Sequence, residues 1–155
     1  MVGRPRHRKV PGERGAAAVE FALVVPLLLA ILFGVISYGF MLSFRQGLSQ
    51  AAAESARAAA VSAVTTDAAR TASATSALDD ALDLYGVTCD GSSLRKGGET
   101  VGTCAVTLAA CANDSTARCA TVDVDYFYEQ HPWVPGLPFV PLPESMHYSA
   151  TARVG

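Results

Sequence analysis

The sequence predicts an α+β fold: a long N-terminal transmembrane helix that continues outside the membrane, a second helix, and a small antiparallel sheet stapled by disulfides. Three observations predict it. An uncharged apolar run extends from Phe21 to Phe44, an alanine-rich run follows it, and the later part of the chain alternates with period two. The expected division is a basic leader (1–15), a transmembrane helix (16–45) and an extracytoplasmic α+β domain (46–155).

The leader is basic and contains proline and glycine, so we expect it to be unstructured. Its charged residues are Arg4, Arg6, Arg8, Lys9, Glu13 and Arg14. They give a net charge of +4, so that with a formal net charge of −2 for the whole chain the remainder carries −6. Positive flanks stay in the cytoplasm, which predicts a cytoplasmic N-terminus and an extracytoplasmic C-terminal domain in the cell membrane. The acidic exterior argues against a nucleic-acid partner.

The uncharged run is long enough for a membrane span. As a helix it would extend about 36 Å, and a bilayer core is about 30 Å thick. Pro26 removes one backbone hydrogen bond within it, which predicts a kink. Ala30, Gly34 and Ser37 fall on one face, where small residues would let a second helix approach closely. The alternative is that alanine and glycine are simply common in such segments.

Helical character should continue beyond Arg45 to about Val64, because the sequence there is rich in alanine. A second helix is predicted from Asp67, which can cap its start, to Tyr85, with Gly86 ending it. Its apolar stripe would consist of Ala74, Ala77, Leu78, Ala81, Leu82 and Tyr85.

Three strands are predicted after the second helix, over residues 99–110, 119–129 and 146–154. In the last two, alternate residues are apolar and should share one face of the sheet. These residues are Ala120, Val122, Val124, Tyr126 and Tyr128 in one strand, and Met146, Tyr148, Ala150, Ala152 and Val154 in the other. The long helix or the second helix would cover this face.

The four cysteines all lie in the expected extracytoplasmic domain, which predicts two disulfides. Three pairings are open, and we favour Cys111–Cys119 closing a hairpin with Cys89–Cys104 closing the preceding loop. The spacings contain no CxxC, so zinc is disfavoured. A calcium site at Asp79, Asp80 and Asp83 is the weaker alternative to a solvated helix face.

Prolines recur with period three near the end of the domain, as in a polyproline II segment. They are Pro132, Pro135, Pro138 and Pro141, with Pro143 added. A docking segment for a partner and a rigid connection between two strands both fit this pattern, and we favour the rigid connection.

A carboxylate inside the apolar segment, that of Glu20, needs an explanation. Comparable charges cost about 2.5–3.5 kcal/mol at a helix centre, and less near the end of a helix, where the side chain could reach the headgroups. Alternatively, a peptidase cut after Gly15 would create an α-amine on Ala16 that is cationic around neutral pH. This amine could neutralise Glu20 within one helix, or between neighbouring subunits and so set their axial register.

A basic leader ending in glycine, with glutamate five residues into the mature chain, resembles the class III signal of type IV pilins and pseudopilins. The segment RGAAAVEFALVVPLLLAILFGVISYGFMLSFRQGLSQAAAESARAAAV more closely resembles the TadE-like family of tight-adherence, or Flp-type, pilus systems. The resemblance covers roughly residues 14–64. The matching residues are Gly15, Glu20, Phe21, Pro26, Gly34, Arg45, Ala51, Ala52, Glu54, Ala56 and Arg57.

The resemblance implies a pilin-like minor pilin or pseudopilin that helps to assemble or anchor the pilus. A membrane prepilin peptidase would cleave it after Gly15. Its partners would be the membrane, that peptidase, other pilins or pseudopilins and the Tad assembly-platform proteins, with no cofactor, metal or small-molecule substrate. The large outer domain departs from the short Flp major pilins, which argues against the main fibre subunit. Richness in alanine and arginine indicates a GC-rich bacterium such as an actinobacterium.

Three other classes of protein compete with this interpretation. An enzyme is disfavoured because the chain has no GxSxG, HExxH, P-loop or GxGxxG motif, and no nucleophile or acid is evident around His131 or His147. A secreted protein cleaved at the A-x-A site of Ala51 and Ala53 is disfavoured because the uncharged run is long and Arg45 precedes the site. A single-pass anchored binding module that is not processed as a pilin remains the alternative.

Overall fold

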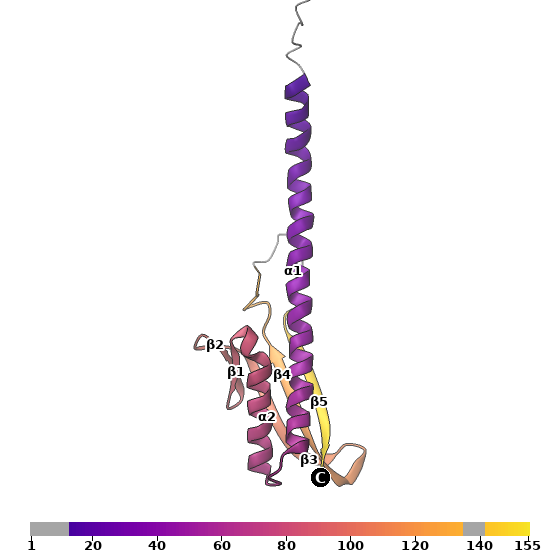
Figure 1. Ribbon diagram of the computed structural model, residues 1–155, viewed down its shortest axis with the longest axis vertical. Coiled ribbons are helices and arrows are strands. Elements are labelled where there is room, and N and C mark those ends of the chain that lie inside the picture. The colour runs from indigo at the N-terminus through magenta and orange to yellow at the C-terminus, as the bar shows by residue number, and fades with distance from the viewer. Residues whose placement is uncertain (1–12, 135–141) are drawn as a thin grey trace, which may run out of the picture. The chain divides into compact units, whose positions relative to one another are not determined.

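The computed structural model describes residues 13–134 and 142–155. These residues form two α-helices, a short 3-10 helix and five strands, which confirms the predicted α+β class with its long N-terminal helix (Figure 1). The chain divides into two compact units, of which the first ends at Ile36 and the second runs from Ser37 to Gly155. The leader up to residue 12 and the prolines of residues 135–141 lie outside the described residues.

Helix α1 spans Glu13–Val61 and runs through Pro26 without interruption. It begins inside the leader that the sequence predicts to be unstructured, and it ends at Val61 rather than near Val64. In the second unit it places a buried stripe at helical spacing, formed by Phe44, Leu48, Ala51, Ala52, Ser55, Ala56 and Ala59. This half of the helix is therefore a wall of the domain core.

Helix α2 spans Asp67–Leu82 and is followed by the 3-10 helix η1, Asp83–Tyr85. The predicted cap at Asp67 is wrong by one residue, because the hydroxyl of Thr66 accepts a hydrogen bond from the N–H of Ala69. Gly86 ends the segment in the left-handed conformation, as predicted. The predicted stripe is buried at Ala74, Leu78 and Leu82 and half-buried at Ala77, Ala81 and Tyr85.

The five strands form one antiparallel meander in the order β1-β2-β3-β4-β5. Their bounds are Val87–Asp90, Ser93–Lys96, Glu99–Cys111, Asp114–Tyr126 and Met146–Val154. The sequence predicts only the last three, because β1 and β2 contain just 4 residues each and are too short to show a period. Gly91 turns between them with a positive φ of 68°.

One face of the sheet is buried, and it is the face that the alternation predicts. The predicted inward residues of β4 and of the segment just after it are all buried, from Ala120 to Tyr128, while the intervening ones are partly exposed. Both helices of the second unit contribute to the same core cluster as these strands. Gly102 in β3 is required by close approach, because a Cβ there would collide with the backbone oxygen of Asp125.

An aromatic cluster closes one end of the core. The ring of Phe44 lies 4.9 Å from that of Tyr85, 4.6 Å from that of Tyr126 and 5.2 Å from that of Trp133, measured between centroids. The contacts with Tyr85 and Tyr126 are edge-on, and aromatic pairs of this kind contribute to stability beyond the burial of their area. The ammonium of Lys96 lies over the ring of Trp133, 3.1 Å from its centre, in a cation–π contact.

Candidate membrane-anchoring and processing segment

The first unit presents an apolar and exposed helix surface. Helix α1 is long and apolar enough to cross a membrane, with a mean hydropathy of 2.7 over its most apolar window and 0% of that window buried. Large apolar side chains such as Val19, Phe21, Leu23 and Leu27 are exposed by 61%, 71%, 74% and 63%. An apolar surface of this extent needs lipid or another apolar helix around it, so the segment is a candidate membrane anchor.

Gly15, Ala16 and Glu20 occupy the first turns of this helix, and all three are exposed. Five residues of helix separate Gly15 from Glu20 by about 7.5 Å along the axis. No hydrogen bond or ion pair joins the carboxylate of Glu20 to another of the described residues. In the uncleaved chain the nitrogen of Ala16 belongs to a peptide bond, so the amine that could pair with Glu20 would exist only after cleavage.

The small residues at Ala30, Gly34 and Ser37 follow one another at helical spacing in α1. Ala30 is exposed, whereas Gly34 and Ser37 are half-buried. A Cβ added at Gly34 would meet no atom within 4 Å. The described chain therefore does not itself require glycine there, and the close helix–helix approach stays a prediction about a partner.

Arg45 ends the uncharged run and is exposed on α1. Its Nε donates a hydrogen bond to the hydroxyl of Tyr148 in β5, a residue 103 positions further along the chain. Nothing in the sequence near Arg45 indicates this partner, because the contact depends on the register of β5 against the helix. The sequence indicates only, through the alternation in β5, that Tyr148 lies on the inner face of the sheet.

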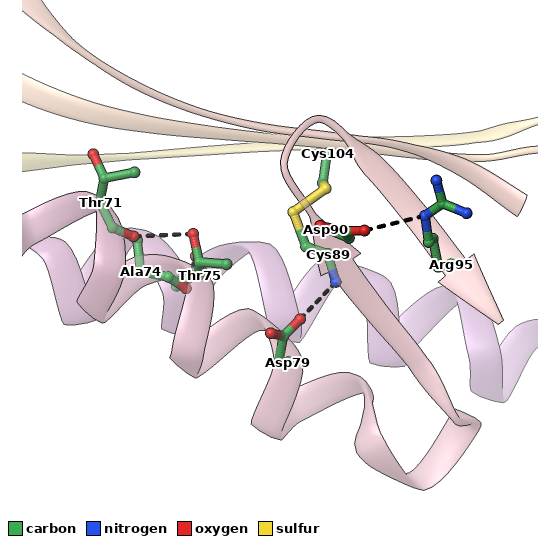
Figure 2. The surroundings of a disulfide bond; sticks show 9 residues. Thr71, Ala74, Thr75, Asp79, Cys89, Asp90, Arg95 and Cys104 are labelled. Atoms are coloured by element: carbon green, nitrogen blue, oxygen red, sulfur yellow. Dashed lines mark hydrogen bonds and ion pairs between the residues drawn. A yellow bond between two sulfur atoms is a disulfide. The ribbon is translucent and has the colours of Figure 1, made fainter. Parts of the chain in front are cut away.

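Two disulfides hold the sheet, and they join the pairs favoured from the sequence. Cys89 in β1 is bonded to Cys104 in β3, and Cys111 in β3 is bonded to Cys119 in β4. Figure 2 shows the first of these, between the β1–β2 hairpin and the strand behind it. The backbone N–H of Cys89 also donates to the carboxylate of Asp79 at 2.6 Å, which fastens α2 to β1 (Figure 2).

This contact gives Asp79 a structural role that the sequence does not reveal. Within residues 13–134 and 142–155, no group of three or more His, Cys, Asp or Glu side chains is placed to hold a metal ion.

The two histidines of the described domain belong to no such group. His147 is exposed and stands opposite Asp125 in the β4–β5 register. The carbonyl oxygen of His131 accepts a hydrogen bond from Tyr126 at 3.0 Å.

Charged contacts link the outer elements of the second unit. Arg118 in β4 donates two hydrogen bonds of 2.8 Å to the carboxylate of Asp67 at the start of α2. This contact lowers the pKa of Asp67 and raises that of Arg118. The pKa of Asp114 is also lowered, because the hydroxyl and the N–H of Thr116 both donate to its carboxylate. Burial against Trp133 lowers the pKa of Lys96.

A comparison with known protein families finds a match within α1. Residues 15–57 match the family model described as TadE-like protein. The chain matches no curated protein and no solved structure. The matched residues begin at Gly15, include Glu20 and Arg45, and end in the half of α1 that packs in the domain core. The resemblance predicted from the sequence is thereby confirmed: residues 15–57 are similar to the TadE-like family.

Proposed function

We propose that the chain is a membrane-anchored minor pilin or pseudopilin that helps to assemble or anchor a tight-adherence pilus. The observation that carries this proposal is the TadE-like match, which begins at Gly15 in the exposed first turns of α1 and includes Glu20, the only acidic residue of the sequence between positions 16 and 45. A prepilin peptidase cleaves after Gly15 and leaves Ala16 as the new N-terminus. The role is structural rather than enzymatic.

The orientation follows from charge. The basic leader stays in the cytoplasm and the disulfide-bonded domain lies outside, where an oxidising environment keeps Cys89–Cys104 and Cys111–Cys119 intact. Other pilins or pseudopilins pack against the exposed face of α1, and the Tad assembly platform handles the anchored subunit. The new amine on Ala16 pairs with Glu20 of the same or of a neighbouring subunit.

Mass spectrometry of the membrane-extracted native chain tests the processing step. The expected N-terminus is Ala16, whereas a start at Met1 or Val2 would identify an unprocessed anchor and favour the binding-module alternative. Gly15→Ala should still allow some processing, because the new side chain is small. A bulky Gly15→Trp should block cleavage and leave the chain in the membrane.

Replacing Glu20 tests the pairing. Glu20→Ala should leave membrane insertion intact but reduce the number of pili, because the amine on Ala16 loses its counter-charge. Electron microscopy of shed pili and blots of membrane fractions measure the two outcomes separately. Val19→Ala is the matched control, since Val19 is the exposed neighbour and carries no charge. Normal piliation in the Glu20→Ala strain would rule out the pairing.

A further inference from the structure

A small hollow lies in the second unit where α1 meets the start of β5. It measures about 170 Å³ and is lined on one side by the apolar chains of Met41 and Met146. The other lining residues include Arg45, Ser145, His147 and Tyr148, which supply N–H and O–H donors. One hollow therefore offers an apolar wall next to a set of polar groups that includes one fixed positive charge.

The positive charge of Arg45 lies directly at the end of the uncharged run. Arg45 is the first charged residue after the uncharged run, and it is the only basic residue between positions 16 and 56. On the helix before it, Phe40 and Leu42 are exposed by 58% and 50%. If α1 crosses a bilayer, these side chains lie in the hydrocarbon and the guanidinium of Arg45 lies at the outer headgroups, where arginine side chains settle.

The guanidinium has donors to spare. Only its Nε is used in the described chain, by the hydrogen bond to Tyr148, which fixes the direction of the side chain. A guanidinium carries five N–H donors, so four remain on the two terminal nitrogens. Other exposed arginines of the domain each pair with a carboxylate: Arg57 with Glu54, Arg95 with Asp90, Arg118 with Asp67, and Arg153 with Asp114. No described carboxylate forms such a pair with Arg45.

We propose that this hollow binds the phosphate of an anionic phospholipid headgroup in the outer leaflet. Arg45 donates to the phosphate oxygens, and Tyr148 is a positioning residue that holds the guanidinium in place. Ser145 and His147 donate to the polar part of the headgroup, while Met41 and Met146 contact its glycerol and first acyl carbons. The lining contains no carboxylate, so the ammonium of a zwitterionic headgroup finds no partner there.

This inference rests on the membrane anchoring in the proposed function, but not on cleavage or on pilus assembly. Its test uses the full chain reconstituted in nanodiscs of equimolar phosphatidylglycerol and phosphatidylcholine, followed by native mass spectrometry of the lipids retained after gentle extraction. The wild-type chain should retain phosphatidylglycerol in preference. Arg45→Gln should lower the ratio of retained phosphatidylglycerol to phosphatidylcholine about tenfold, the loss of one charge-assisted contact. Tyr148→Phe should lower it by less.

Arg57→Gln is the matched control, because Arg57 is an exposed arginine on the same helix and already has Glu54 as its partner. It should keep the wild-type lipid ratio. An equal loss in Arg45→Gln and Arg57→Gln, or no preference in the wild type, would overturn the proposal. So would displacement of the lipid by inorganic phosphate alone, or a loss of dimers rather than of lipid in Arg45→Gln.

Carbonate extraction of native membranes separates this inference from the proposed function. A wild-type chain released into the soluble fraction would remove both, since neither survives without an anchor. The headgroup site alone would be refuted if the chain stays in the membrane and is cleaved to begin at Ala16, but retains both lipids equally. A lipid preference in a chain that is never cleaved would leave the site standing and the pseudopilin role refuted.

Discussion

Tyr126 shows how one buried polar group is accommodated in this core. Its side chain is fully buried, its ring packs against Phe44, and its hydroxyl donates to the carbonyl oxygen of His131 at 3.0 Å. The proton is needed for this hydrogen bond, and a phenolate would be stranded among apolar side chains. Burial, with a smaller contribution from the neighbouring Tyr128, raises the pKa of Tyr126 to about 12.

The raised pKa predicts a loss of stability at high pH. In the unfolded chain Tyr126 ionises near its ordinary pKa of about 10, whereas the folded chain holds the proton until about 12. The stabilisation is therefore fully present below about pH 10 and is lost as pH rises from there through about 12. Circular-dichroism melts of the detergent-solubilised chain, without reductant, should show the domain melting earlier across this interval. Tyr126→Phe should flatten that dependence and cost about 1 kcal/mol at neutral pH through the lost hydrogen bond.

Tyr85→Phe is the control for this experiment. It removes a hydroxyl from the same aromatic cluster, one that donates to the carbonyl oxygen of Ser43 at 3.3 Å, and it leaves Tyr126 unchanged. The Tyr85→Phe variant should therefore lose stability between about pH 10 and pH 12 in the same way as the wild type. Parallel alkaline curves for the wild type and Tyr126→Phe would show that another group is responsible.

At the residue scale, sequence reasoning places side chains on faces but does not identify their partners. The alternation in β4 predicts correctly that Tyr126 is buried, because the side-chain period of a strand is fixed by its backbone. The contact between Arg45 and Tyr148 could not be predicted, since it depends on how β5 lies against α1. Local pairs such as Glu54 and Arg57, three residues apart in one helix, need no such tertiary information.

Among the elements, the β1–β2 hairpin is the one that the sequence does not predict. It is held in place by a disulfide bond. Each strand has 4 residues, and an isolated two-stranded hairpin is only marginally stable in water. The disulfide Cys89–Cys104 ties β1 to the long strand β3, and Asp79 fastens the same strand to α2 (Figure 2). Strands this short are recognised from their partners rather than from a period.

Removing this disulfide should therefore loosen the hairpin selectively. The double variant Cys89→Ser, Cys104→Ser opens a loop with a sequence separation of 15, which should cost about 3 kcal/mol of stability in the loop-entropy account. Hydrogen-exchange mass spectrometry should show protection lost first in β1 and β2, with β4 and β5 still protected.

The second disulfide provides the comparison. Cys111→Ser with Cys119→Ser opens a shorter loop, with a separation of 8, and should cost about 2.5 kcal/mol. Because this bridge lies within the β3–β4 hairpin, the β1–β2 hairpin should keep its protection. The same exchange pattern in both double variants would show that neither disulfide acts locally.

On the scale of the whole chain, α1 belongs to two units at once. Its first part carries the exposed apolar surface, and its second part supplies the wall of the domain core. The sequence marks the end of the uncharged run at Phe44 and so suggests that the outer domain starts at residue 46. The compact second unit starts at Ser37, and the exposed fraction of Phe44 in it is 1%. The end of the uncharged run therefore does not coincide with the start of the compact second unit.

The position of Phe44 predicts where the domain can be cut. A fragment of residues 43–155 keeps the aromatic cluster and should unfold cooperatively on heating. A fragment of residues 46–155 loses Phe44, and Phe44→Ala in the longer fragment mimics that loss, which should cost about 3–5 kcal/mol.

A fragment of residues 62–155 loses the whole helix wall, including the fully buried Leu48, and should not fold. Circular dichroism and proton–nitrogen correlation spectra would compare the fragments under non-reducing conditions. If the fragment 46–155 proved as stable as the fragment 43–155, Phe44 would be buried without contributing to the stability of the domain. The expected loss would instead mean that the turns of α1 around Phe44 are part of the domain core, and that the stability of the sheet depends on them.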